Sequence, residues 1–125
     1  MKFISWNIDS INAALTGTST RAGETRDVLH KIYDLKPDVV AIQETKLSKT
    51  GPTKKHYQAL DQLFPGYQVA WRSSVEPARK GYAGTMYLYR GEYHPTVTYP
   101  AIGAPEPMDE EGRIITLEFP DFFVT

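Results

Sequence analysis

The stretch D-V-V-A-I-Q-E-T-K, Asp38 to Lys46, decides the fold that we predict for this chain. Residues 39–42 form a continuous apolar run, which is typical of a strand that is covered on both faces. Such a strand delivers Glu44 to its carboxyl end. We therefore expect a buried strand at residues 38–43, with a carboxylate where the strand gives way to a loop.

A helix and another strand precede this stretch. From Thr25 onwards, apolar residues recur at the spacing of an amphipathic helix, which Pro37 ends. Closer to the N-terminus, residues 2–8 are mostly β-branched and aromatic, and they predict a buried strand that ends in a polar loop. A partial helical turn is expected at residues 11–15. A strand, a helix and a strand in this order indicate a parallel βαβ-like unit.

Another helix and a series of short strands follow the stretch. Residues 53–64 carry an amphipathic pattern that ends before the turn at Pro65 and Gly66. Further strands are expected at residues 67–73, 85–89, 96–99, 114–119 and 122–125. Since no internal repeat or linker divides the chain, the pattern predicts one domain of the α/β or α+β class.

The composition and the missing motifs exclude several classes of function. With 125 residues, of which 41% are hydrophobic, the chain can bury a core of its own. The lack of cysteine excludes disulfides and thiolate metal sites, and we expect a reducing, cytoplasmic location. No apolar run is long enough for a membrane span, so we expect no membrane partner. Neither a Gly-rich nucleotide-binding loop nor a Gly-flanked serine nucleophile is present, and the histidines have no metal-ligand spacing.

The formal net charge of -1 conceals a segregation of charge along the chain. Residues 45–60 carry only basic charges, residues 68–91 are mostly basic, and residues 92–121 are mostly acidic. A basic rim on a nearly neutral protein indicates a phosphate-binding face. A solvated, lysine-rich loop is the alternative interpretation.

Polar side chains follow both strands of the expected βαβ-like unit. Asn7 and Glu44 each lie where an apolar strand gives way to a loop, and Asp9 follows shortly after Asn7. Neighbouring strands would bring such ends together, and carboxylate and amide oxygens are the ligands that Mg²⁺ or Mn²⁺ prefers. The spacing alone also allows a plainer role for Glu44, as a helix cap or as a partner in a surface ion pair.

The loop A-R-K-G-Y-A-G-T, residues 78–85, is basic and has an aromatic residue between glycines. Arg79 and Lys80 could meet phosphates while Tyr82 stacks on a sugar or enters a groove of DNA. An ordinary surface loop whose tyrosine packs on the protein is the alternative.

Several segments, taken together, favour the metal-site and DNA-contact interpretations over the plainer alternatives. They are F-I-S-W-N-I (residues 3–8), I-Q-E-T-K (42–46), K-G-Y-A-G-T (80–85) and E-G-R-I-I (111–115). In order and spacing they resemble the exodeoxyribonuclease III family of AP endonucleases, within the endonuclease/exonuclease/phosphatase superfamily. The runs G-P-T-K-K-H from Gly51 and E-P-A-R-K-G-Y from Glu76 are similar to the ExoA-like enzymes of Gram-positive bacteria. The resemblance spans the whole chain.

The resemblance implies a role for each site residue. Glu44 would bind the metal, Mg²⁺ or Mn²⁺, Asn7 would orient the scissile phosphate, and Asp9 would be an auxiliary metal contact. The residues expected to contact DNA are Lys80, Tyr82 and Arg113, together with Arg79, Lys54 and Lys55. Many family members carry an arginine soon after the residue that matches Asp9, whereas this chain has Ser10, Ile11 and Asn12 there.

The resemblance also implies a fold and a function. The expected fold is half of a four-layer α/β sandwich, in which one mixed β-sheet carries helices on one face. Residues 1–125 would be the N-terminal part of a single domain whose C-terminal half, with its G-D-x-N and S-D-H elements, is expected to be absent. An uncovered inner sheet face would then favour self-association.

The expected activity is that of a metal-dependent DNA-repair nuclease, a hydrolase that acts as an endonuclease at abasic sites and as an exonuclease at 3′ ends. DNA is the expected partner. One alternative is a truncated, catalytically inactive fragment with residual DNA or metal binding. Another phosphodiesterase or phosphatase of the same superfamily is the remaining alternative.

Overall fold

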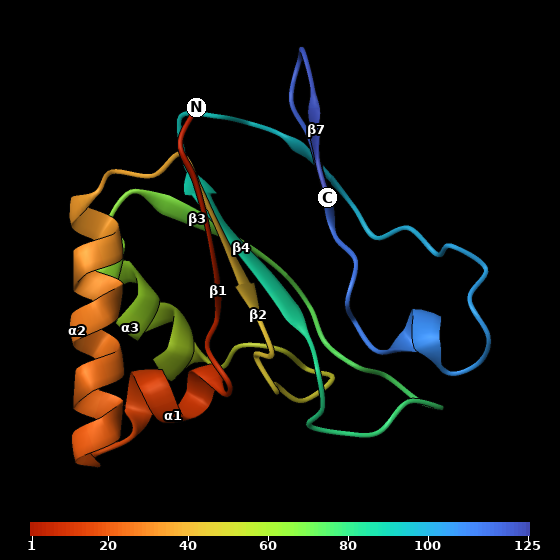
Figure 1. Ribbon diagram of the computed structural model, residues 1–125, viewed down its shortest axis with the longest axis horizontal. Helices are drawn as coiled ribbons and strands as arrows, with labels where there is room; N and C mark the ends of the chain where they lie inside the picture. Colours follow the sequence, from red (N-terminus) through yellow and green to blue (C-terminus); the bar gives the residue numbers. More distant parts are fainter.

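The computed structural model describes residues 1–125. It consists of a mixed β-sheet that carries helices on one face and a smaller antiparallel sheet on the other (Figure 1). The four-stranded sheet has the order β1-β2-β4-β3. The three-stranded sheet has the order β5-β6-β7. The expected mixed sheet with helices on one face is therefore confirmed.

The predicted parallel pair forms the start of the larger sheet. β1 (Phe3–Asn7) lies parallel to β2 (Val39–Gln43), with Asn7 opposite Gln43. The antiparallel strands β4 (Thr85–Arg90) and β3 (Tyr67–Arg72) complete the sheet. Because β1 and β2 run in the same direction, their carboxyl ends meet at one edge of the sheet.

The expectation that β1 is buried is wrong, because it is an edge strand and is paired on one side only. Its side chains alternate between partly buried and exposed. Ile4 and Trp6 pack against the core beneath the helices, while Phe3 on the other face is 51% exposed. β2 lies between β1 and β4, and Val39, Val40 and Ile42 are all buried, as the apolar run predicts.

Three helices cover one face of the sheet: α1 (Ile11–Thr16), α2 (Thr20–Asp34) and α3 (Lys54–Leu63). Ser10, Ser19 and Thr53 cap their N-termini. The Ser19 cap explains why α2 begins before Thr25, the start expected from the apolar pattern. Apolar side chains of all three helices form one buried cluster with β2 and β4.

The smaller sheet contains β5 (Thr96–Thr98), β6 (Thr116–Glu118) and β7 (Phe123–Val124). The short 3-10 helix η1 (Met108–Glu110) lies in the connection between β5 and β6. Leu117 and its neighbours pack with Val39 and Tyr87 on the face of the larger sheet that the helices leave free. The chain thus covers part of its own inner sheet face. None of its helices has the length and apolar character needed to cross a membrane.

Candidate functional site

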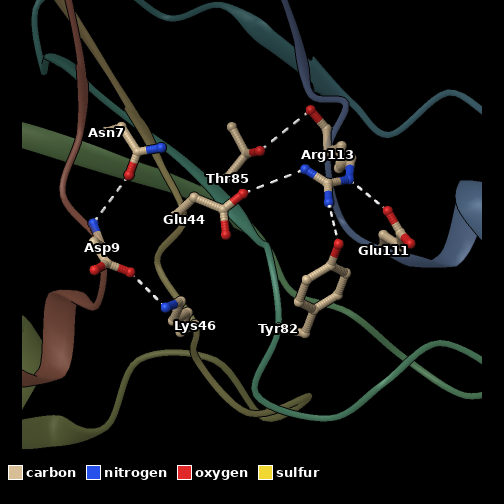
Figure 2. Close-up of polar contacts among 8 residues, drawn as sticks. All are labelled: Asn7, Asp9, Glu44, Lys46, Tyr82, Thr85, Glu111 and Arg113. Carbon is tan, nitrogen blue, oxygen red and sulfur yellow. Dashed lines mark hydrogen bonds and ion pairs between the residues drawn. The ribbon is translucent and has the colours of Figure 1, made fainter.

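The carboxyl ends of β1 and β2 bring Asn7, Asp9 and Glu44 together (Figure 2). Backbone hydrogen bonds tie the loops that follow these strands. The Ile8 amide donates to the Gln43 carbonyl at 3.1 Å, and the Ser10 amide donates to the Glu44 carbonyl at 2.8 Å. The predicted convergence of the two strand ends is thereby confirmed.

Both loops have unusual backbone conformations. Asp9 and Ser10 have φ values of 50° and 93°, and Glu44 and Lys46 have φ values of 56° and 54°. Positive φ is uncommon for residues other than glycine and costs about 1–3 kcal/mol each, so the surrounding structure must hold it in place. The Lys46 amide is held by the carbonyl of Ala83, to which it donates at 2.8 Å. Such strained positions cluster at functional sites.

Asp9 forms an ion pair with Lys46, whose Nζ lies 2.5 Å from Oδ1 of the carboxylate. The hydrogen bond from Lys46, with its positive charge, holds the pKa of Asp9 below the ordinary value. The Asp9 amide in turn donates to Oδ1 of Asn7 at 3.1 Å. From the sequence, Lys46 is expected to contribute positive charge towards DNA phosphates, but its contact with Asp9 is not expected, although its place on the Glu44 loop is a signal that could have found it.

Arg113 connects the remaining residues of the site (Figure 2). Its guanidinium donates to Glu44 Oε1 at 3.3 Å, to Glu111 Oε2 at 2.5 Å and to the Tyr82 hydroxyl at 2.9 Å. It also lies 5.3 Å from the centroid of the Tyr82 ring. The hydrogen bond with Glu111 is the main reason why the pKa of Arg113 is raised. Arg113 therefore places a cation beside the Glu44 carboxylate and links this carboxylate to Tyr82.

The segment that carries Arg113 is fixed by contacts that the sequence did not reveal. The Arg72 guanidinium donates to the carbonyls of Pro100, Asp109 and Ile114 at 3.1–3.2 Å. Gly112 has a φ of 71°, and a Cβ there would lie 2.5 Å from the Ser73 carbonyl carbon. Only glycine fits this close approach without strain.

Of the other expected DNA-contact residues, Arg79 and Lys80 lie on the loop that carries Tyr82, whereas Lys54 and Lys55 lie on α3. Arg79 lies over the Tyr82 ring, 6.0 Å from its centroid, and Lys80 is an exposed neighbour that pairs with Glu76 at 3.7 Å. Lys54 and Lys55 are exposed in the first turn of α3. The structure records no contact between these two lysines and the residues around Glu44.

The oxygen atoms at this edge of the sheet suit a hard divalent cation. Glu44 and Asp9 offer carboxylates and Asn7 an amide oxygen, which are donors that Mg²⁺ and Mn²⁺ accept. Both carboxylates pair with cationic side chains, and the structure contains no group of three or more His, Cys, Asp or Glu residues that could hold a metal. The donor set fits a cation that keeps water and phosphate among its ligands, the usual state of protein-bound Mg²⁺.

Comparison of the sequence with protein families finds a match over residues 4–124, to the Endonuclease/Exonuclease/phosphatase family. An exodeoxyribonuclease of Streptococcus pneumoniae serotype 4 is 64% identical over 125 residues, which are 100% of this chain and 46% of that relative. The chain thus spans about half the length of this relative.

Solved structures share the fold. An AP endonuclease from Leishmania major, LMAP, matches with a TM-score of 0.61 and 25% identity over 92% of this chain and 34% of its own. The 3′ phosphatase NExo from Neisseria, bound to a product DNA hairpin, matches with a TM-score of 0.63 and 23% identity. That match covers 98% of this chain and 39% of the phosphatase.

Proposed function

Because the chain belongs to the endonuclease/exonuclease/phosphatase family, we propose that it serves in a metal-dependent DNA-repair nuclease. The reaction is hydrolysis of phosphodiester bonds in DNA, at abasic sites and at 3′ ends. Support comes from the 64% identity with an exodeoxyribonuclease and from the structural likeness to an AP endonuclease. The observation that carries the proposal is the meeting of Asn7, Asp9 and Glu44 with Arg113 and Tyr82 at one sheet edge.

The proposed division of labour follows from the chemistry of each side chain. Glu44 and Asp9 would hold Mg²⁺ or Mn²⁺, which when bound supplies positive charge to a phosphoryl oxygen and to the leaving oxygen. The amide of Asn7 orients the scissile phosphate. Arg113 and Tyr82 lie against the DNA backbone, where a cation and an aromatic ring can contact phosphate and sugar.

The neighbouring basic residues add to DNA affinity without reading sequence. Arg79 and Lys80 lie on the loop that carries Tyr82, while Lys54 and Lys55 extend the positive charge along α3. Because such contacts release counterions from DNA, binding should weaken steeply with salt.

Cleavage of a duplex that contains one abasic site tests the proposal. The full protein product that contains this chain should cut this duplex in the presence of Mg²⁺, and Glu44→Gln should reduce the rate by at least about 10²-fold, the scale of a lost catalytic electrostatic contact. Glu118→Gln is the control, because Glu118 is an exposed carboxylate on β6 with no ion pair. Equal rates for both variants would remove Glu44 from the reaction, and hydrolysis of a phospholipid in place of DNA would point to another phosphodiesterase of the family.

A second candidate function is DNA or metal binding by residues 1–125 without turnover. It is favoured by the donor set described above, in which each carboxylate already faces a cation and no third acidic or histidine ligand joins them. The same abasic duplex, incubated with the 125-residue chain alone, distinguishes the two functions. Glu44-dependent cleavage by this chain would exclude the second candidate.

From the lack of cysteine we also propose a cytoplasmic location.

We further propose that the chain self-associates through its inner sheet face. Phe3 and Phe123 are 51% and 66% exposed, and Ala41, Tyr87 and Val124 line a hollow beside Phe3. Exposed apolar patches of this kind are typical of protein–protein contacts. Sedimentation velocity at rising concentration tests the association, which Phe123→Ser should weaken, and a strictly monomeric chain would refute it.

A further inference from the structure

The side chain of one arginine has no partner inside the fold. The others are each held by hydrogen bonds, ion pairs or an aromatic ring: Arg26, Arg72, Arg79, Arg90 and Arg113. Arg21, in the first turn of α2, is exposed, and although its backbone carbonyl accepts from the Thr25 hydroxyl, its guanidinium takes part in none of the ion pairs or hydrogen bonds of the structure. Its guanidinium is therefore available to a ligand without loss of an internal contact.

Arg21 lies beside the candidate site. It lines an open cavity of about 280 Å³ together with Asn7 and Asp9, and the hydroxyl-bearing residues Ser19 and Thr25 line the same cavity. Figure 1 shows why: α2 begins at the end of the molecule where β1 and β2 finish. The cavity thus joins the first turn of α2 to the sheet edge that carries the proposed metal ligands.

The charges around this cavity favour an anion. Asp9 is the one carboxylate among the lining residues, and its charge is offset by Lys46, 2.5 Å away. Lys46 and Arg21 are thus two cations facing one carboxylate, and the three side chains together carry a net positive charge.

We propose that Arg21 binds a backbone phosphate of the DNA strand in the candidate site, next to the phosphate that is cleaved. The inference rests on the nuclease function proposed above and adds a binding residue to it. A guanidinium can donate two parallel hydrogen bonds to one phosphate, which fixes the position of the strand as well as its charge. Because the contact is with phosphate, it should stabilise intact and abasic duplexes of any sequence equally.

Binding of an intact duplex as a function of salt tests the role of Arg21. The full protein product that contains this chain is titrated with the duplex in a chelator, so that binding is measured without cleavage. Log affinity falls with log salt concentration, and Arg21→Ala should make this negative slope shallower by about 0.9, the value for one lost phosphate contact. The advantage of the unaltered protein over this variant should then shrink about 3.5-fold between 50 and 200 mM salt.

Lys31→Ala is the matched control. Lys31 is an exposed cation on the same helix, has no ion pair, and lies about 15 Å further along the helix axis than Arg21. Its removal changes the net charge by the same amount and should leave the salt slope unchanged. Arg21→Lys keeps a positive charge and should retain most of the slope. Because the Arg21 side chain has no internal partner, Arg21→Ala should unfold at the same temperature as the unaltered protein.

Several results would overturn the inference. They are an unchanged slope in Arg21→Ala, an equal loss in Lys31→Ala, or no duplex binding by the unaltered protein. The nuclease proposal is judged separately, by Glu44-dependent cleavage of the abasic duplex. Cleavage together with an unaffected slope refutes the role of Arg21 alone, whereas an Arg21-dependent slope without cleavage refutes the nuclease activity alone.

Discussion

Replacement of Gly112 by alanine should destabilise the segment that positions Arg113. Gly112 has a φ of 71°, and the added Cβ would lie 2.5 Å from the Ser73 carbonyl carbon and 2.9 Å from the Arg72 carbonyl oxygen. These neighbours are backbone atoms, so they cannot move away as a flexible side chain could. We therefore expect a backbone rearrangement around Arg72, whose guanidinium holds the same segment.

Gly112→Ala has two free-energy costs, the left-handed backbone conformation of alanine and the steric overlap of its Cβ, and Gly103→Ala separates them. Gly103 lies in the same connection between β5 and β6 and has a φ of 74°, but nothing lies within 4 Å of a Cβ placed there. Gly103→Ala therefore carries only the cost of left-handed backbone in alanine, about 1–2 kcal/mol. Gly112→Ala should add about 1–3 kcal/mol for the steric overlap, as in overpacked cores.

Thermal unfolding at a fixed protein concentration measures both effects. For a domain of 125 residues, 1 kcal/mol corresponds to about 4 °C in Tm. Gly103→Ala should lower Tm by about 4–8 °C, and Gly112→Ala by about 8–20 °C. Equal Tm values for the two variants would show that no backbone overlap exists at Gly112, and the account of how Arg113 is positioned would be wrong.

Further changes test the site and the core. Lys46→Met should raise the pKa of Asp9 towards its ordinary value of 3.8, as followed by NMR titration of the carboxyl carbon, because the hydrogen bond from Lys46 is the largest cause of the lowering; an unmoved pKa would contradict the ion pair. Burial lowers the pKa of His56 below 6.5, so unfolding takes up a proton and the free energy of unfolding should fall as pH drops below 6.5. His56→Gln should make this pH dependence shallower in denaturant titrations, and an identical slope would argue against the buried neutral imidazole. Leu88→Ala, at a side chain with 0% exposure, should cost about 2–5 kcal/mol in the same measurement. Val28→Ala on the exposed face of α2 should change stability by no more than about 0.5 kcal/mol, and a similar loss for both would contradict the assigned core.

Local patterns in the sequence were sufficient to predict the α-helices and strands and their order, but not the short 3-10 helix η1. The apolar run at residues 39–42 predicted a buried strand, and the helical spacing of apolar residues after Thr25 predicted a helix, because burial and helical period are both visible in the spacing of apolar residues. The start of α2 was misplaced, since Ser19 extends the helix through a cap that the apolar pattern does not contain. The burial of β1 was also predicted wrongly. β1 is an edge strand because no strand pairs on its other side, and the residues of β1 do not reveal whether a neighbouring strand is present.

The sequence by itself therefore determined the class of fold and placed Asn7 and Glu44 at strand ends, since both depend on residues that are close along the chain. Only the tertiary structure decided which distant residues meet there. Arg113 reaches Glu44 across 69 positions, and Lys46 reaches Asp9 across 37, because strand pairing and loop closure bring them together. Arg21 likewise shares a cavity with Asp9 only because α2 begins beside the end of β1. Spacing along the chain encodes the period of each element, whereas the contacts between elements arise from how their faces pack.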